Sequence, residues 1–182
     1  LQAGEATNRD LWEKMIRLSE GEFNAIYSRL GVRFDHTLGE SFYNPRLKSV
    51  VRQLQSAGLA RTSDGAVVVF FDEDADLKPH PALIQKSDGA ANYTTTDLAT
   101  LEHRLEAWHP DEIVYVTDGR QQLHFKQVFA VFRRWQPHIQ VKLVHVWFGA
   151  ILGENGKPIK TRSGDTIKLT DHLDEADSRA FP

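Results

Sequence analysis

Residues 113–146, IVYVTDGRQQLHFKQVFAVFRRWQPHIQVKLVHV, decide the fold class of this chain. The apolar, β-branched run at 113–116 predicts a strand, the segment 119–135 has the apolar spacing of a helix, and 141–146 predict a further strand. The buried face of the helix is expected to carry Leu123, Val128, Phe129 and Phe132. Strands that alternate with helices in this way pair in parallel through right-handed crossovers, so the stretch predicts an α/β fold built on a parallel sheet.

The same alternation extends on both sides of this stretch. Residues 82–86 predict a short buried strand of the same sheet, and Thr95 or Thr96 is expected to cap the helix that follows. Thr170 is expected to cap a last helix. The apolar face of the first of these helices is expected to carry Leu98, Leu101, Leu105 and Trp108. Residues 82–182 are thus predicted to form one α/β unit.

Residues 1–81 have a different character. A capping box of Ser19 and Glu22 predicts a helix that begins there. Asn44-Pro45 predicts the start of a second helix, and Ser63-Asp64-Gly65 predicts the turn of a β-hairpin. The buried face of the second helix is expected to carry Leu47, Val50, Val51 and Leu54. This part is therefore predicted to contain helices and a small antiparallel element, with a domain boundary after residue 81.

The composition is that of a globular protein and excludes several function classes. The chain has 182 residues, of which 41% are hydrophobic and 26% charged, and it lacks cysteine, which excludes disulfide scaffolds and thiolate sites. The net charge of −3 excludes a nucleic-acid binder that acts by bulk basic charge. The longest apolar run, at 66–71, is far shorter than the roughly 20 residues that a membrane-spanning helix needs. A cytoplasmic protein is expected.

Candidate ligand contacts are expected where the predicted parallel strands end. In an open parallel sheet, ligands bind beyond the carboxyl ends of the strands and beside the N-termini of the helices. Tyr93 and Asp97 lie at such a helix start, where the helix dipole favours a carboxylate. The alternative is that Asp97 and the neighbouring threonines cap the helix.

Two further polar groups lie at the same predicted edge. Gln121 follows Asp118 at a strand-to-helix junction, which suits either helix capping or the rim of a pocket. His145, Phe148 and Gly149 follow the last strand, and a glycine after an aromatic residue lets a flat ligand approach the backbone closely. The histidine is alternatively a hydrogen-bonded core residue.

A glycine-flanked loop at 153–165 contains Lys160, Thr161 and Arg162. Such a loop suits closure over phosphates, with Lys as a point charge and Arg as a planar fork, although a solvated hairpin fits the same residues. The sequence has no catalytic zinc motif, no nucleophile elbow and no phosphate-binding P-loop.

Several short stretches follow one another in a specific order. They are Gly39 to Pro45 (GESFYNP), Asp64 to Ala66 (DGA), Gln85 to Gly89 (QKSDG), Tyr93 to Ala99 (YTTTDLA), Val116 to His124 (VTDGRQQLH), His145 to Gly149 (HVWFG) and Lys160 to Asp165 (KTRSGD). Each stretch alone is weak evidence for any family, but the ordered set resembles the second half of the catalytic domain of a class I arginyl-tRNA synthetase.

The resemblance implies a doubly wound, Rossmann-like catalytic domain, with residues 82–182 as its second half and residues 1–81 as the tail of an α+β connecting insertion. It implies an arginine–tRNA ligase, which uses ATP to convert L-arginine to arginyl-adenylate and then transfers the arginyl group to tRNA(Arg). Mg²⁺ is expected to accompany the ATP. Family members usually form the adenylate only with tRNA bound. The full-length protein is expected to be a monomer without membrane association.

The same resemblance implies the roles of individual residues. Asp97 would pair with the guanidinium of the substrate, and Tyr93 and Gln121 would contact the substrate in the same pocket. Six residues would form the ATP site: His145, Phe148, Gly149, Lys160, Thr161 and Arg162. Lys160 and Arg162 are both candidates for the catalytic cation, because Thr161-Arg162 stands where class I enzymes commonly carry Lys-Ser.

Two features of the sequence lead us to expect a fragment. The family's His-x-Gly-His signature is absent, and residue 1 is Leu rather than an initiating Met. The chain is therefore expected to be inactive in isolation. A first alternative is a non-catalytic, synthetase-like module that binds arginine or a nucleotide. A second is an unrelated nucleotide-binding fold, in which the spacing of Tyr93, Asp97 and Gln121 would be coincidental.

Overall fold

A computed structural model describes residues 5–150, 152 and 169–180. The chain forms two compact units, Leu38–Gly149 and Leu1–Thr37 with Ala150–Pro182. The predicted boundary after residue 81 separates a connecting insertion from the catalytic domain. It is a different kind of division from these compact units and stays a prediction.

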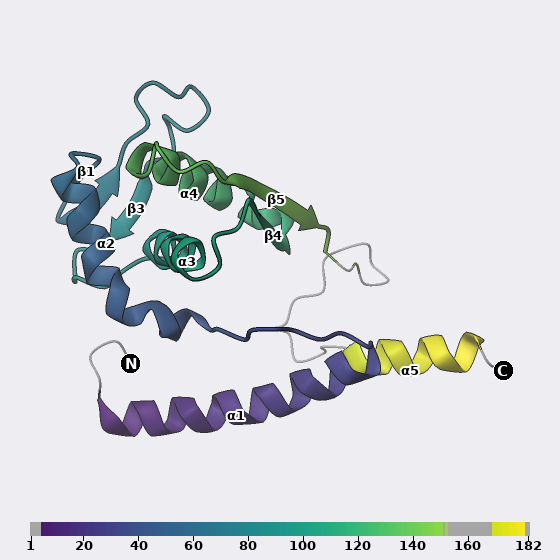
Figure 1. The fold of residues 1–182 in the computed structure, drawn as a ribbon. Coiled ribbons are helices and arrows are strands. Elements are labelled where there is room, and N and C mark those ends of the chain that lie inside the picture. Colours follow the sequence, from purple (N-terminus) through teal and green to yellow (C-terminus); the bar gives the residue numbers. More distant parts are fainter. Residues whose placement is uncertain (1–4, 151, 153–168, 181–182) are drawn as a thin grey trace. The chain divides into compact units, whose positions relative to one another are not determined.

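The unit Leu38–Gly149 contains the sheets and the core (Figure 1). Its elements are, in order, η1 (Glu40–Tyr43), α2 (Asn44–Ser56), β1 (Ala60–Ser63), β2 (Ala66–Val69), β3 (Ala82–Gln85), α3 (Tyr93–Trp108), β4 (Glu112–Asp118), η2 (Gly119–Gln121), α4 (Gln122–Trp135) and β5 (Lys142–Phe148). The other unit contains α1 (Ala6–Arg29) and α5 (Leu169–Ala180).

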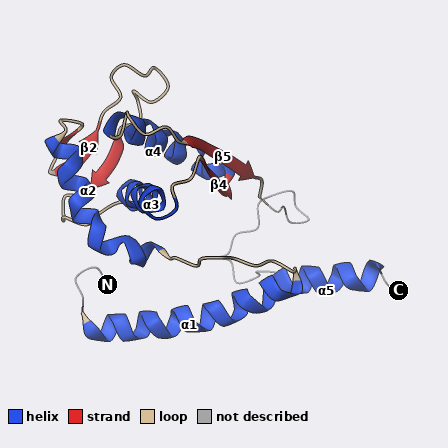
Figure 2. Ribbon diagram, in the orientation of Figure 1, coloured by secondary structure: helices blue, strands red, loops and turns tan. Residues whose placement is uncertain are grey.

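The strand–helix–strand prediction for residues 113–146 is confirmed. β4 and β5 pair in parallel, with Ile113 opposite Leu143 and Tyr115 opposite His145, and η2 and α4 connect them (Figure 2). The ring of Tyr115 lies 4.6 Å from that of Phe125, so α4 covers this face of the strand pair. Val114, on the opposite face, is 48% exposed. The observed mixed α/β fold with a parallel sheet agrees with the predicted fold class.

The strand at residue 82 is placed differently from the prediction. β3 does not join β4 and β5 but pairs antiparallel with β2, in a three-stranded sheet of order β1-β2-β3. β3 has only four residues, and the open edge of β2 satisfies its backbone. The side-chain amide of Gln127 on α4 donates to the carbonyls of His80 and Pro81, which fixes the chain where it enters β3. The prediction of a parallel partner for this strand was therefore wrong.

The hairpin and the second helix are confirmed. β1 and β2 pair antiparallel, and the turn residues Asp64 and Gly65 both have positive φ, 48° and 78°. That geometry is the type I′ turn for which Asp-Gly is favoured. α2 begins at Asn44 with Pro45 in its first turn, and its buried residues are the predicted Leu47, Val50, Val51 and Leu54.

The start of α1 was predicted incorrectly. The helix begins at Ala6, because the carboxylate of Glu5 accepts hydrogen bonds from the backbone N–H groups of Thr7 and Asn8, at 3.1 and 2.9 Å. Ser19 and Glu22 therefore lie inside a helix that is already formed. A capping-box pattern marks a helix start only where the preceding residues are not helical.

The cap of α3 also differs from the prediction. α3 begins at Tyr93 with Asn92 as its N-cap residue, so neither Thr95 nor Thr96 caps it. Thr95 is buried, and its hydroxyl donates to the carbonyl of Ile84 on β3 at 2.6 Å. The threonine hydroxyl thus fixes α3 to β3 instead of capping the helix.

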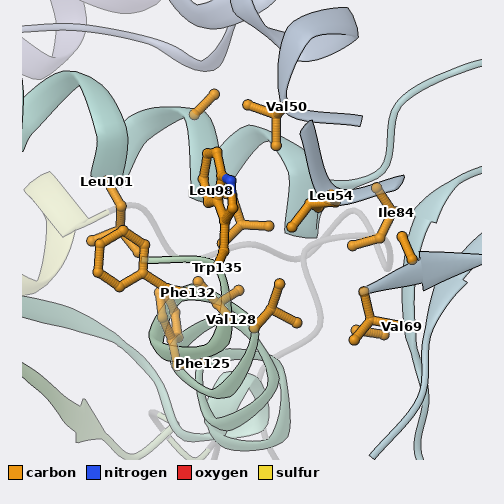
Figure 3. Close-up of a cluster of buried hydrophobic side chains, with 14 of the residues drawn as sticks. Val50, Leu54, Val69, Ile84, Leu98, Leu101, Phe125, Val128, Phe132 and Trp135 are labelled. Carbon is orange, nitrogen blue, oxygen red and sulfur yellow. The ribbon is translucent and has the colours of Figure 1, made fainter. Parts of the chain in front are cut away.

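Helices α2, α3 and α4 share one hydrophobic core with the strands (Figure 3). Fully buried members of this core are Val50, Leu54, Val69, Ile84, Leu98, Leu101, Val128 and Phe132. Leu98 and Leu101 thus lie where the helical spacing placed them. Leu123 does not, because α4 turns Phe125 and Val128 inward and leaves Leu123 40% exposed.

The unit with α1 and α5 is held by ion pairs. The guanidinium of Arg29 donates to Asp174 and to Asp177, each at 2.6 Å. Neither helix has a buried residue among those described. Leu11 and Leu18 of α1 are 56% and 74% exposed. Of the helices in the described ranges, none is long and apolar enough to cross a membrane.

The positions of Leu98 and Leu123 predict that their replacement by Ala lowers the free energy of unfolding by very different amounts. Leu98→Ala should lower the free energy of unfolding by about 2 to 5 kcal/mol, because it removes a fully buried side chain. Leu123→Ala is the matched control and should cost less than about 1 kcal/mol, since its side chain already contacts water. Urea unfolding followed by circular dichroism measures both. Equal losses for the two variants would contradict the assignment.

Candidate functional site

The start of α4 lies at the carboxyl end of β4, and a hydrogen bond joins the N-terminal part of α3 to the first turn of α4. η2 begins at Gly119, directly after β4, and leads into α4. A Cβ at Gly119 would lie 3.3 Å from Trp147 Cδ1 and 3.5 Å from the carbonyl oxygen of Phe148. A glycine therefore lets the chain turn close to the end of β5. This turn places the first residues of α4 at the strand edge where ligands are expected.

A hydrogen bond joins the two helix starts. His124 Nε2 lies 2.5 Å from Asp97 Oδ2, and the two side chains are 23% and 27% exposed. Asp97 is the fifth residue of α3, and His124 is the third residue of α4. The two side chains are thus partly shielded from solvent but remain accessible at the surface.

The predicted arginine-pocket residues flank this hydrogen bond. Tyr93 lies four residues before Asp97 on α3, so the two share a helix face, and Tyr93 is 68% exposed. Gln121 is exposed and immediately precedes α4, three residues before His124. Gln121 makes no side-chain hydrogen bond that caps the helix. The fold thus brings Tyr93, Asp97 and Gln121 to the two adjoining helix starts.

His145 occupies the neighbouring position at the end of the strands. Its Nε2 lies 2.8 Å from Thr117 Oγ1 on β4, and its ring lies 4.6 Å from that of Phe125. Burial lowers the pKa of His145 below the ordinary value of 6.5, and the charge of His124 lowers it further. The lowered pKa favours the neutral form of His145.

The remaining predicted residues have different surroundings. Phe148 is 55% exposed at the end of β5. Within the part of the chain that the structure describes, a Cβ at Gly149 would have no heavy atom within 4 Å. Lys160, Thr161 and Arg162 lie outside the described residues.

Asp118 acts as a helix cap. Its carboxylate accepts hydrogen bonds from the backbone N–H of Arg120 and from the guanidinium of the same residue, at 2.8 to 3.0 Å. Bonding to Arg120 lowers the pKa of Asp118. Of the two interpretations of this junction, the cap applies to Asp118, whereas Gln121 remains free to line a pocket.

His124 is the residue that sequence reasoning undervalued. Its sequence signal was present, because it follows Gln121 by one helical turn. Its partner was not readable from the sequence, since the pairing with Asp97 spans 27 residues and depends on how α3 packs against α4. Among the described residues, no cluster of three or more His, Cys, Asp or Glu side chains is arranged to hold a metal ion.

Comparisons with known proteins show the family to which the chain belongs. The family model described as tRNA synthetases class I (R), catalytic domain, matches residues 1–182. This chain belongs to that family. Among its relatives, the arginine–tRNA ligase of Rhodopirellula baltica is 50% identical over 180 residues, and that of a Nostoc species is 48% identical over 184.

The relatives are much longer than this chain. Each alignment covers 99% of the chain but only 26% of the Rhodopirellula protein and 31% of the Nostoc protein. Among solved structures, the arginyl-tRNA synthetase of Plasmodium falciparum matches with a TM-score of 0.80 and 28% identity, over 98% of this chain and 29% of that one. The chain thus spans about a quarter to a third of the length of the proteins it resembles.

The surroundings of His145 predict a measurable titration. Because its pKa is lowered in the folded state, the unfolded chain binds more protons near pH 6, and stability should fall as the pH drops through 6.5. The ring proton resonances of His145, followed by NMR, should show a midpoint below 6.5. His124→Gln should raise that midpoint, because it removes a neighbouring positive charge. A midpoint at or above 6.5 in the unmodified chain would contradict this account.

Proposed function

We propose that this chain is part of the catalytic domain of an arginine–tRNA ligase, with Tyr93, Asp97 and Gln121 in the arginine pocket. The observation that carries the proposal is the partly exposed Asp97 carboxylate of α3, which is hydrogen-bonded to His124 in the first turn of α4, the helix that follows β4 and η2. Family membership supports the same assignment. The chain alone contains only part of the site, so the activity belongs to the full-length ligase.

The arginine side of the site follows from charge and shape. A guanidinium carries a fixed positive charge and presents paired N–H donors to a carboxylate. Asp97 supplies the anion from the second turn of α3; the expected place in the first turn is not observed, because the helix begins at Tyr93 and has no acidic residue in its first turn. The exposed ring of Tyr93, one turn earlier on the same helix face, offers a flat surface for the planar substrate group. Gln121 adds a neutral polar contact from the start of α4.

The ATP side of the site is proposed around His145, Phe148 and Gly149. A neutral His145 donates or accepts a hydrogen bond without adding charge, and the absence of a side chain at Gly149 lets a flat base approach the backbone. Further along the chain, Lys160, Thr161 and Arg162 are proposed to bind the phosphates, with Lys160 or Arg162 as the catalytic cation. Mg²⁺ would arrive with the ATP and neutralise phosphate charge.

The proposed activation of arginine needs no general base. The substrate carboxylate is already ionised, so one of its oxygens attacks the α-phosphorus, the bond to the pyrophosphate oxygen breaks, and pyrophosphate leaves with its electron pair. The product is arginyl-adenylate. A hydroxyl of the terminal ribose of tRNA(Arg) then attacks its carbonyl carbon, the bond to the phosphate oxygen breaks, and AMP leaves together with the hydroxyl proton. Catalysis then consists of positioning and of stabilising charge at the α-phosphate.

The proposal extends to the organisation of the full-length protein. Residues 1–81 would be the tail of the connecting insertion, and residues 82–182 the second half of a Rossmann-like catalytic domain. The ligase is proposed to act as a monomer in the cytoplasm.

Removing the Asp97 charge tests the proposed function. In the full-length ligase, ATP–pyrophosphate exchange should depend on L-arginine and on tRNA(Arg). Asp97→Asn should raise the KM for arginine by about 30-fold or more, because a charged partner of the guanidinium is lost. Asp111→Asn, which neutralises an exposed carboxylate outside the site, is the control and should leave the KM unchanged.

Two outcomes would contradict the proposal. An arginine KM that Asp97→Asn leaves unchanged would remove Asp97 from the pocket. A wild-type protein without arginine-dependent exchange, but with saturable arginine or nucleotide binding by calorimetry, would instead indicate a non-catalytic binding module.

A further inference from the structure

We propose that His124 is a positioning residue that orients the Asp97 carboxylate toward the guanidinium of the substrate and so favours arginine over lysine. This inference rests on the proposed function, in which Asp97 binds the guanidinium. It assigns to His124 a role in substrate selectivity through Asp97, without contact between His124 and the reacting atoms.

A short hydrogen bond holds the Asp97 carboxylate. His124 Nε2 lies 2.5 Å from Oδ2 of Asp97, so the imidazole N–H donates to that oxygen. Among the described residues, Oδ1 of Asp97 has no hydrogen-bond partner. Oδ2 also retains a second lone pair, because a carboxylate oxygen has two acceptor positions. The carboxylate is thus held at one oxygen and can still accept a paired donor.

The hydrogen bond from His124 also limits rotation of the Asp97 carboxylate. The terminal torsion of an aspartate side chain has a broad energy profile, so an unbonded carboxylate turns over a wide range of angles. A hydrogen bond to Oδ2 restricts that range. A guanidinium donates two parallel bonds and needs the carboxylate in its own plane, whereas an ammonium is a point charge that tolerates many orientations. A fixed carboxylate therefore favours arginine over lysine.

His124 is itself held in place by the hydrophobic core. The residue lies in the first turn of α4, and its ring makes an edge contact with Phe125 at 5.1 Å. Phe125 is only 3% exposed and also contacts Tyr115 of β4 and His145 of β5. The core thus anchors the helix turn that carries His124. Through His124, the Asp97 carboxylate is held at a fixed position relative to β4 and β5.

Paired variants of His124 in the full-length ligase test the inference. His124→Leu removes the donor and should raise the KM for arginine about tenfold, the change expected for one lost hydrogen bond to a charged group, with kcat and the KM for ATP within about twofold. His124→Gln keeps an N–H donor and should retain most of the wild-type arginine KM. Competition by lysine should be unchanged in both variants. His138→Leu, at an exposed histidine, is the matched control.

The outcomes separate the inference from its alternatives. If His124 only supports the fold, His124→Leu and His124→Gln should lower the melting temperature and impair ATP and arginine kinetics together, which would overturn the inference. An unchanged arginine KM in His124→Leu, in an enzyme that Asp97→Asn impairs, would also overturn it and leave the proposed function intact. If Asp97→Asn has no effect, the proposed function itself fails. In the Asp97→Asn background, His124→Leu should have no further effect on the arginine KM.

Discussion

Helices α3 and α4 pack against each other over a shared hydrophobic core, and the site depends on that packing. Leu98 and Leu101 of α3 and Val128 and Phe132 of α4 are fully buried. A displacement of either helix would therefore expose apolar surface and cost stability. Because the helix starts cannot shift independently, Asp97 and His124 remain within hydrogen-bond distance although they lie 27 residues apart.

The same packing places two chemically different surfaces side by side in the site. One side has an anion, Asp97, next to an exposed aromatic ring, which suits a planar cation. The other side has a histidine whose pKa is lowered by burial, followed along β5 by the exposed ring of Phe148, which suits an uncharged flat base. Phe125 contacts both histidines and so lies between the two sides. The proposed function, which joins an amino acid to a nucleotide, requires such adjoining but electrostatically distinct surfaces.

Local patterns in the sequence predicted most of the elements, whereas contacts between distant residues were harder to predict. The spacing of Val50 and Leu54, the Asp64-Gly65 turn and the β4–α4–β5 alternation each depend on residues close in the chain, and each is confirmed. The pairing of β3 with β2 depends on which strand edge is free, and the start of α1 on a competing cap at Glu5. Asp97 was predicted as a site residue because it lies near the N-terminus of a helix. Its pairing with His124 could be seen only in the tertiary structure.

A crystal structure of the full-length ligase with L-arginine bound tests the central claim most directly. The account predicts that the guanidinium lies against the Asp97 carboxylate, with paired hydrogen bonds, and that His124 Nε2 stays bonded to Oδ2. An arginine molecule bound away from the starts of α3 and α4 would contradict the proposed pocket. A guanidinium on Asp97 with His124 turned away would contradict the positioning role and leave the pocket in place.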